Sequence, residues 1–144
     1  MEFTNNDYLH PELYAWRLDW EAWSAKFIHP QTRKKDWDAI VEEVGNDIYV
    51  YPIFTKEFCK KIIEEAEYHN KWTVDRHDSY PTTDFLLKDI GLEDMYRRTL
   101  EEYGFEIAKW KWGLTGKMWD KKMKAETFLA RYNPKAQGHL DSHI

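Results

Sequence analysis

The chain is poor in cysteine, has no long apolar segment and lacks an excess of basic residues. Cys59 is its single cysteine among 144 residues, so no disulfide can form within the chain. No stretch approaches the roughly twenty consecutive apolar residues that a transmembrane helix requires. Lysine and arginine number 21 against 26 aspartates and glutamates, for a net charge of −5. This balance argues against a general nucleic-acid-binding protein, because such proteins carry an excess of basic residues.

The cysteine count and the N-terminus bear on the compartment. A lone cysteine fits a reducing compartment better than a secretory one. Met1–Phe3 provides neither the basic nor the apolar region of a signal peptide. The second observation carries little weight, because the motifs described below indicate part of a longer protein. Cys59 stands between Phe58 and Ile62, where we expect a small buried hydrophobe without a redox or catalytic role.

Aromatic residues are abundant, with eight tryptophans and nine tyrosines. The mean hydropathy of −0.81 shows that the remaining sequence is very polar. A disordered chain does not carry so many aromatic residues, and the length suffices for one domain with a buried core. We therefore expect a globular domain with a charged surface.

An apolar stripe near the N-terminus predicts an amphipathic helix bounded by Pro11 and Pro30. Such a stripe more often forms core than a binding site. Residues 31–46 read as a charged connection, so residues 1–46 are expected to form a Trp-rich helical lead-in. The stripe recurs every three or four residues and consists of Leu13, Trp16, Trp20, Trp23 and Phe27.

Residues 47–144 alternate between β-rich and helical patterns. A strand is expected over 47–54, with Pro52 at an edge or end, followed by a helix that Thr55 caps and Asn70 ends. The apolar face of this helix is expected to comprise Phe58, Ile62, Ile63 and Ala66. A turn-rich loop over 75–81, a strand near 83–87, a helix over 92–103 that runs on toward Trp112, and a final strand over 124–132 are expected next. This order alone indicates an α+β domain.

The C-terminal segment carries a metal-site pattern. Residues 126–143 read ETFLARYNPKAQGHLDSH. A His-x-Asp motif on a strand places an imidazole and a carboxylate on one face, because strand side chains alternate. With a distant second histidine, this pair forms the facial triad of non-haem iron oxygenases. His143 is one candidate for the first ligand, and the complete motif formed by His139 and Asp141 is the alternative; either histidine could also be a solvated residue near a chain end.

The segment from Glu126 to His143 resembles the start of the iron site in the lysyl hydroxylases, the procollagen-lysine 2-oxoglutarate dioxygenases. The eleven-residue interval from Tyr132 to His143 matches that family, whereas His139 stands only seven residues after Tyr132, so His143 is favoured. Further segments follow in the family's order, and the resemblance covers nearly the whole chain. They are Asn5-Asn6-Asp7, Phe27-Ile28-His29-Pro30, residues 47–54 (DIYVYPIF), residues 55–65, and residues 80–84 (YPTTD) with Ile90-Gly91.

This resemblance implies a double-stranded β-helix, the jelly-roll or cupin-like fold, here truncated and with flanking helices. Residues 47–144 would be the first part of the dioxygenase domain, and the Asp ligand, the distal His and a co-substrate Arg would lie beyond Ile144. The implied activity is hydroxylation of peptidyl lysine, in collagen or collagen-like Gly-X-Y chains, to 5-hydroxylysine. It uses Fe(II), 2-oxoglutarate, O2 and ascorbate. A homodimer and the endoplasmic reticulum are implied in the same way, although the lone cysteine leaves the cytoplasm open.

The resemblance also indicates two residues for binding 2-oxoglutarate. Tyr132 matches a family tyrosine that can donate its phenol hydrogen to the far carboxylate; the alternative is a strand tyrosine in the core. Arg76 corresponds to a family arginine before the Pro-Thr-x-Asp motif, within a shorter loop, and is otherwise a solvated cation. Asp84 projects away from Thr83 and Phe85, as a residue of a pocket wall or as a loop-capping carboxylate.

One further pattern supports a different class of function. Lysines and tryptophans interleave over residues 109–124, as in aromatic-basic surfaces that bind polyanions. We instead expect lysines that cover buried indoles. The alternative to an enzyme is a non-catalytic module that binds a protein or glycan, with a vestigial iron site. In either case the 144-residue chain alone is expected to be inactive, because it cannot present three fixed iron ligands.

Overall fold

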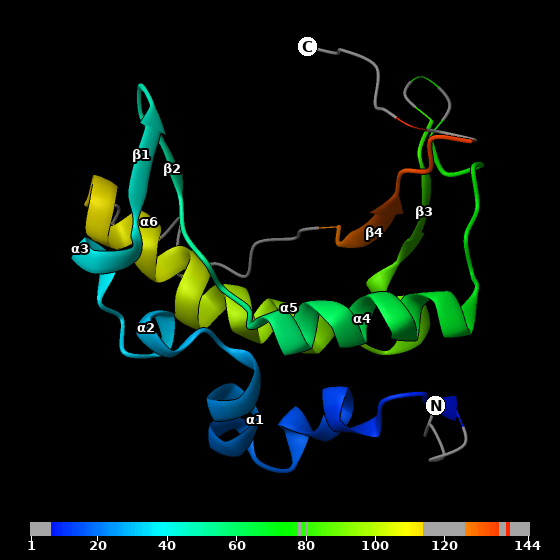
Figure 1. Ribbon diagram of the computed structural model, residues 1–144, viewed down its shortest axis with the longest axis horizontal. Helices are drawn as coiled ribbons and strands as arrows, with labels where there is room; N and C mark the ends of the chain where they lie inside the picture. Colours follow the sequence, from blue (N-terminus) through cyan, green and yellow to red (C-terminus); the bar gives the residue numbers. More distant parts are fainter. Residues whose placement is uncertain (1–6, 78, 80, 114–125, 136–137, 139–144) are drawn as a thin grey trace.

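The computed structural model describes residues 7–77, 79, 81–113, 126–135 and 138. This part of the chain is α+β, as predicted, and its strands form two separate two-stranded antiparallel sheets (Figure 1). None of its helices is long and apolar enough to cross a membrane. The elements are η2 (Pro11–Arg17), α1 (Trp20–Phe27), α2 (Pro30–Arg33), α3 (Trp37–Ile40), β1 (Glu42–Gly45), β2 (Ile48–Val50), α4 (Lys56–His69), β3 (Thr83–Leu86), η3 (Leu87–Ile90), α5 (Glu93–Thr99), η4 (Leu100–Gly104), α6 (Phe105–Trp112) and β4 (Phe128–Arg131).

The predicted N-terminal helix is wrong as a single element, because it breaks into the 3-10 helix η2 and the α-helix α1. Asp19 causes the break: its extended backbone ends η2, and its carboxylate accepts a hydrogen bond from the Ala22 amide at 3.0 Å, as an N-cap does. The Trp23 indole donates to the Leu13 carbonyl at 3.1 Å and joins the two pieces. The predicted stripe is nevertheless buried, apart from the partly buried Trp16.

The charged segment expected to be a connection contains α2, α3 and β1 instead. Strand β1 pairs with β2 in a hairpin whose turn uses the left-handed backbone of Asp47, with φ of 58°. The strand expected over residues 47–54 is therefore only three residues long, and it ends at Val50, two residues before Pro52. The sequence did not reveal β1, because this strand lies in the charged segment before β2 and lacks the alternating apolar pattern of a strand.

Helix α4 begins and ends where the sequence predicts. The Thr55 hydroxyl accepts a hydrogen bond from the Phe58 amide at 3.2 Å, and Asn70 stops the helix in a left-handed conformation. Phe58 and Ala66 are buried as expected. Ile63 is an exception, because its side chain is 62% exposed beside a cavity that the described residues leave open.

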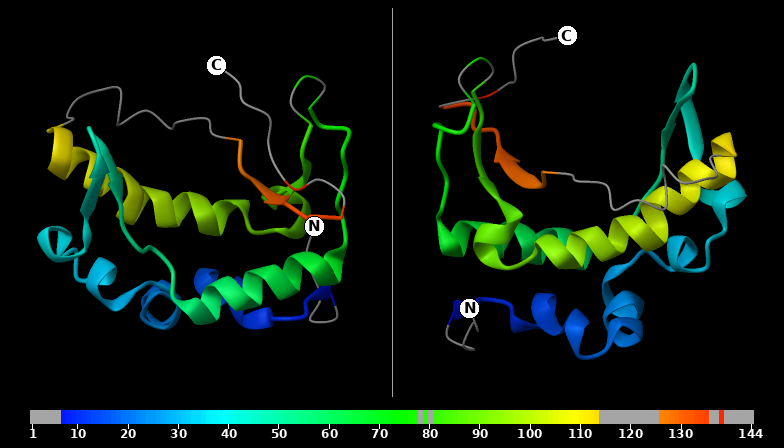
Figure 2. Two further views of the ribbon diagram at one scale, coloured as in Figure 1. Left: turned by 45° about the horizontal axis from the view of Figure 1, so that its top comes forward. Right: turned by 180° about the vertical axis from the view of Figure 1, so that it is seen from behind.

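The third predicted helix continues past Gly104 as expected. It consists of α5, the π-helical turn η4 and α6, and it ends at Gly113 with φ of 60°. Figure 2 shows this composite helix beside α4. The ring of Phe54, two residues before α4, stacks on that of Tyr96 in α5, with centroids 6.4 Å apart. The segment through α1 packs below α4, whereas the β1–β2 hairpin and the β3–β4 sheet rise on the other side of α4 at opposite ends (Figure 1).

The second sheet is formed by the two strands closest to the predicted site. β3 matches the strand expected near residues 83–87, and β4 covers residues 128–131 of the strand expected over 124–132. The two pair antiparallel in a regular register. The α+β class is thus confirmed, while the double-stranded β-helix stays a prediction, since the described strands do not form one.

Candidate functional site on the β3–β4 sheet

The β3–β4 sheet has one face toward the helices and one face away from them. Asp84 pairs with Ala130, and Phe85 pairs with Leu129. Directly opposed residues share a face and neighbours along a strand alternate, so these two pairs lie on different faces. Phe85 is buried against Trp72, with ring centroids 4.8 Å apart, and Leu129 packs on the same core. Asp84 therefore lies on the face opposite the helices.

Asp84 is a fully buried carboxylate with three polar neighbours. Arg76 Nε donates to its Oδ1 at 2.6 Å, the Thr82 hydroxyl donates to its Oδ2, and His77 Nε2 lies 3.6 Å from Oδ2. The backbones of Thr73 and Asp84 exchange hydrogen bonds of 3.0 and 2.9 Å, which aligns the loop of Arg76 with the free edge of β3. A buried charge requires such a partner, so Asp84 fixes the position of Arg76.

Arg76 is not a solvated loop cation, since its side chain is only 16% exposed. Nη1 donates to the Glu126 carboxylate, Nη2 lies 3.4 Å from His77 Nε2, and the guanidinium covers the Phe128 ring at 5.2 Å. One guanidinium thus faces two carboxylates. A carboxylate that binds Arg76 through Nη1 would compete with Glu126, whose side chain is 59% exposed.

Tyr132 follows β4 directly, and its side chain is 47% exposed rather than part of the core. It lines a cavity of about 270 Å³ together with Trp72 and Arg131. Arg131 covers the Trp72 ring at 4.6 Å and donates to Glu67 of α4 at 3.1 Å. Tyr132 thus lines a cavity on the helix side of the sheet, whereas Arg76 lies with Asp84 on the other face. The described structure does not bring the two residues into contact, and their roles toward 2-oxoglutarate stay predictions.

A larger apolar cavity of about 460 Å³ lies between α4, α5 and β4. Cys59 lines it and is exposed, so the expectation of a buried cysteine is wrong. Cys59 lies near the start of α4, on the side of the helix that faces this cavity, and no described residue covers it. The apolar residues of the lining include Phe54, Phe58, Ile62, Ile63, Met95, Tyr96, Phe128 and Leu129.

The predicted iron ligands His143, His139 and Asp141 lie outside the described residues. Among the residues that are described, no group of three or more histidines, cysteines, aspartates or glutamates could hold a metal ion. The described part of the sheet alone therefore does not supply an iron site. The sheet carries the Arg76–Asp84 pair, and β4 precedes the predicted ligands in the sequence.

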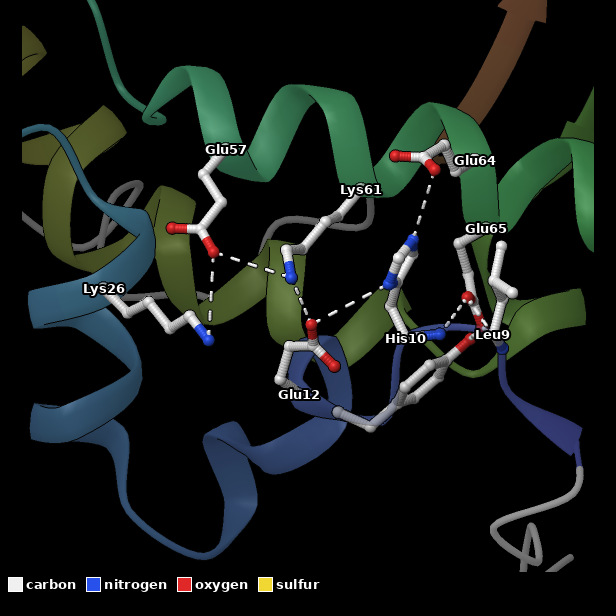
Figure 3. Close-up of polar contacts among 9 residues, drawn as sticks. Leu9, His10, Glu12, Lys26, Glu57, Lys61, Glu64 and Glu65 are labelled. Carbon is white, nitrogen blue, oxygen red and sulfur yellow. Dashed lines mark hydrogen bonds and ion pairs between the residues drawn. The ribbon is translucent and has the colours of Figure 1, made fainter.

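A second buried carboxylate, Glu65 of α4, was missed by the sequence analysis (Figure 3). It accepts hydrogen bonds from the amides of Leu9 and His10 at 3.1 and 2.8 Å, and from the Tyr14 hydroxyl at 3.1 Å. His69 Nε2 lies 3.1 Å away, one turn along the helix. Burial and the negative charge and hydrogen bond of Glu65 raise the pKa of Tyr14. In the sequence, the one indication that Glu65 is buried was its position beside the apolar face of α4.

Further ion pairs join the lead-in to α4 beside Glu65. Lys61 Nζ binds Glu12 and lies 3.5 Å from Glu57, which also approaches Lys26 (Figure 3). Partial burial acts to raise the pKa of Glu12, but the hydrogen bond and charge of Lys61 outweigh it and lower that pKa below its usual value. The hydrogen bond from Lys61 to Glu12 raises the pKa of Lys61. The lead-in is thus held by charge as well as by aromatic packing.

The expectation of buried indoles over residues 109–124 is wrong for the described part of that stretch. Trp110 and Trp112 are 41% and 47% exposed. Trp112 packs edge-on against Tyr49 of β2, with centroids 5.6 Å apart, and Lys111 Nζ covers the same tyrosine ring at 4.7 Å. Lys117, Lys121, Lys122, Lys124 and Trp119 lie outside the described residues.

Comparison with known proteins assigns the chain to a family. The OGFOD2-like domain matches residues 4–116, which is most of the chain. The chain therefore belongs to the OGFOD2-like domain family. This match ends before β4, so it covers Arg76 and Asp84 but not Tyr132 or the predicted iron ligands.

Curated relatives extend the similarity past that point and confirm the resemblance to lysyl hydroxylases. The chain is 28% identical to the multifunctional procollagen lysine hydroxylase and glycosyltransferase LH3 of Rattus norvegicus, over 96% of this chain and 20% of the relative. It is 28% identical to procollagen-lysine,2-oxoglutarate 5-dioxygenase 1 of Homo sapiens, over 94% of this chain and 20% of the relative. It is 26% identical to the multifunctional procollagen lysine hydroxylase and glycosyltransferase of Caenorhabditis elegans, over 93% of this chain and 20% of the relative. The chain spans about a fifth of the length of these relatives.

Proposed function

We propose that the chain forms the first part of the catalytic domain of a 2-oxoglutarate-dependent lysyl hydroxylase. The observation that carries this proposal is the similarity to procollagen lysine hydroxylases over 96% of the chain. The proposed substrate is a lysine in collagen or in a collagen-like Gly-X-Y chain, which becomes 5-hydroxylysine. The helix-backed β3–β4 sheet supports the proposal, because its open face carries a buried ion pair where β4 leads toward the predicted ligands.

The proposed roles divide between described and undescribed residues. His143 is proposed as the first iron ligand, with His139 and Asp141 as the alternative, and Fe(II) with 2-oxoglutarate and O2 supplies the oxidising chemistry when bound. Arg76 offers Nη donors to a carboxylate, because Asp84 already holds its Nε. Tyr132 offers a phenol donor at the end of β4.

A non-catalytic module that binds a protein or glycan is the second candidate function. The observation that favours it is the exposure of Trp110 and Trp112, which with Lys111 and Tyr49 form an open aromatic-basic patch. Exposed aromatic rings that lie beside a cation suit stacking on a flat ligand. This patch lies on the hairpin and α6, at the far end from β3–β4 (Figure 1). Substitutions in the two regions can therefore separate the two functions.

The test is lysine hydroxylation by a protein that contains this chain together with a complete iron site. A collagen-like lysine peptide is incubated with Fe(II), 2-oxoglutarate and ascorbate, and 5-hydroxylysine is measured by mass spectrometry. His143→Ala is expected to abolish the product, whereas His139→Ala is the matched control and retains it. Loss in the control alone would assign the iron to His139 and Asp141. Absence of the product from the unsubstituted protein would favour the binding module.

The assembly and the compartment are proposed from the same relatives. We propose a homodimer located in the endoplasmic reticulum, with the cytoplasm as the alternative because Cys59 is the single cysteine. Light scattering of the purified protein tests the dimer. Localisation of a tagged protein that contains this chain tests the compartment.

A further inference from the structure

Two arginines on opposite faces of the β3–β4 sheet have similar surroundings. Arg76 covers the Phe128 ring at 5.2 Å and donates to Glu126. Arg131 covers the Trp72 ring at 4.6 Å and donates to Glu67 at 3.1 Å. Each guanidinium therefore combines one aromatic face with one exposed glutamate. Because the two sites are alike, the Arg131–Glu67 site can serve as a control for the Arg76–Glu126 site.

The two sites differ in what holds the arginine. Arg76 Nε is fixed by the fully buried Asp84 at 2.6 Å, and its side chain is less exposed than that of Arg131. Because loss of its cation is costly for a buried carboxylate, the Arg76–Asp84 pair is strongly favoured in the folded chain. The arginine is thereby oriented with its Nη1 toward Glu126.

Glu126 is the exchangeable partner in this arrangement. Its side chain is 59% exposed, and an ion pair with such exposure contributes little to stability because water competes for both groups. A guanidinium held in place by one carboxylate can bind a second carboxylate without losing further conformational freedom. The position that Glu126 occupies is therefore suited to the carboxylate of a ligand.

We propose that Glu126 is a built-in competitor, which occupies a carboxylate-binding position on Arg76 and is displaced by a small-molecule carboxylate. The identification of that ligand with 2-oxoglutarate rests on the proposed function, whereas the binding position itself does not. Occupancy by Glu126 weakens binding of the ligand at Nη1, because the ligand has to displace the Glu126 carboxylate from that donor.

The experiment is a titration of the 144-residue chain, without iron, with 2-oxoglutarate and with glutarate. Binding is followed at the Arg76 side-chain Nε–H signal in ¹⁵N-edited NMR spectra. Glu126→Gln keeps the shape of the side chain but removes its charge, and we expect it to tighten the dissociation constant about two- to fivefold. Glu67→Gln, at the Arg131 site, is the matched control and leaves the constant unchanged.

Arg76→Lys completes the test. It keeps a cation beside Asp84 but removes the planar fork, so it should abolish the gain produced by Glu126→Gln, while the near-ultraviolet circular dichroism reports whether the fold is kept. Equal constants for wild type and Glu126→Gln, including no binding by either, would overturn the proposal. A larger response at Arg131 than at Arg76 would do the same. Because the titration needs neither iron nor a lysine peptide, its failure is distinct from absence of hydroxylation.

Discussion

Glu65 of α4 and His10 of the lead-in are joined by a 2.8 Å hydrogen bond from the His10 amide to the Glu65 carboxylate, across a separation of 55 residues (Figure 3). The carboxylate is fully buried and also accepts from the Leu9 amide and the Tyr14 hydroxyl. A buried carboxylate is stable only when such donors surround it. Glu65 therefore fixes the lead-in on the helix that supports the β3–β4 sheet.

Glu65→Gln should destabilise the chain by about 3 kcal/mol, because it removes the charge that several buried donors share. The measurement is the free energy of unfolding in urea. Protection of the Leu9 and His10 amides from hydrogen exchange should fall at the same time. Glu64→Gln is the control, since Glu64 is the more exposed neighbour on the same helix, and its effect should stay within about 0.5 kcal/mol. Equal losses in the two variants would show that Glu65 does not act as described.

The Glu12–Lys61 pair should make the stability depend on pH in the acidic range. The folded pKa of Glu12 is lowered, so its contribution is present above its ordinary value near 4.5 and is lost as the pH falls through the folded pKa. The raised pKa of Lys61 acts in the alkaline range, where its contribution is lost above the ordinary value near 10.5.

The measurement is the difference in thermal midpoint between wild type and Glu12→Gln from pH 3 to 8. This difference should be constant near neutral pH and shrink below about pH 4.5. The other carboxylates titrate in both proteins, so their effects largely cancel in the difference. A difference that stays the same down to pH 3 would contradict the role of this ion pair.

Features set by local sequence were predictable, and helix α4 shows why. Its start at Thr55 and its stop at Asn70 depend on hydrogen bonds within a few residues, which the residue types reveal. The break at Asp19 was not found, because a 3-10 helix and an α-helix both place apolar residues three or four positions apart. Periodicity therefore located the core of the lead-in but not its shape.

The candidate site was only half predictable for a related reason. The sequence indicated Arg76 and Asp84 separately, but their ion pair depends on the bridge between Thr73 and Asp84, which no local pattern reveals. The contact between Arg76 and Glu126 spans 50 residues and depends on the pairing of β3 with β4. The exposure of Cys59 likewise depends on what covers α4, and not on its neighbours in sequence.

The ion pair of Arg76 and Asp84 should be much stronger than that of Arg131 and Glu67. A double-mutant cycle of Arg76→Gln and Asp84→Asn measures the first pair, and Arg131→Gln with Glu67→Gln measures the second as the control. Asp84→Asn alone should cost about 3–5 kcal/mol, since it leaves the guanidinium without its buried partner. The exposed pair should show a coupling of about 0.2–1 kcal/mol. Similar couplings in the two cycles would mean that the burial of Asp84 does not strengthen the first pair.

Tyr132→Phe should chiefly raise the concentration of 2-oxoglutarate required by a hydroxylase that contains this chain. Loss of one hydrogen bond to a charged group corresponds to about 1.5–3 kcal/mol, which is roughly a ten- to hundredfold weakening. The measurement is succinate release as a function of 2-oxoglutarate concentration, with Tyr49→Phe on the distant hairpin as the control. The 144-residue chain alone should release no succinate above background, because it cannot present three fixed iron ligands. An unchanged requirement in Tyr132→Phe would remove Tyr132 from the co-substrate site. Turnover by the chain alone would show that the chain holds a complete iron site, with His139 and Asp141 among its ligands.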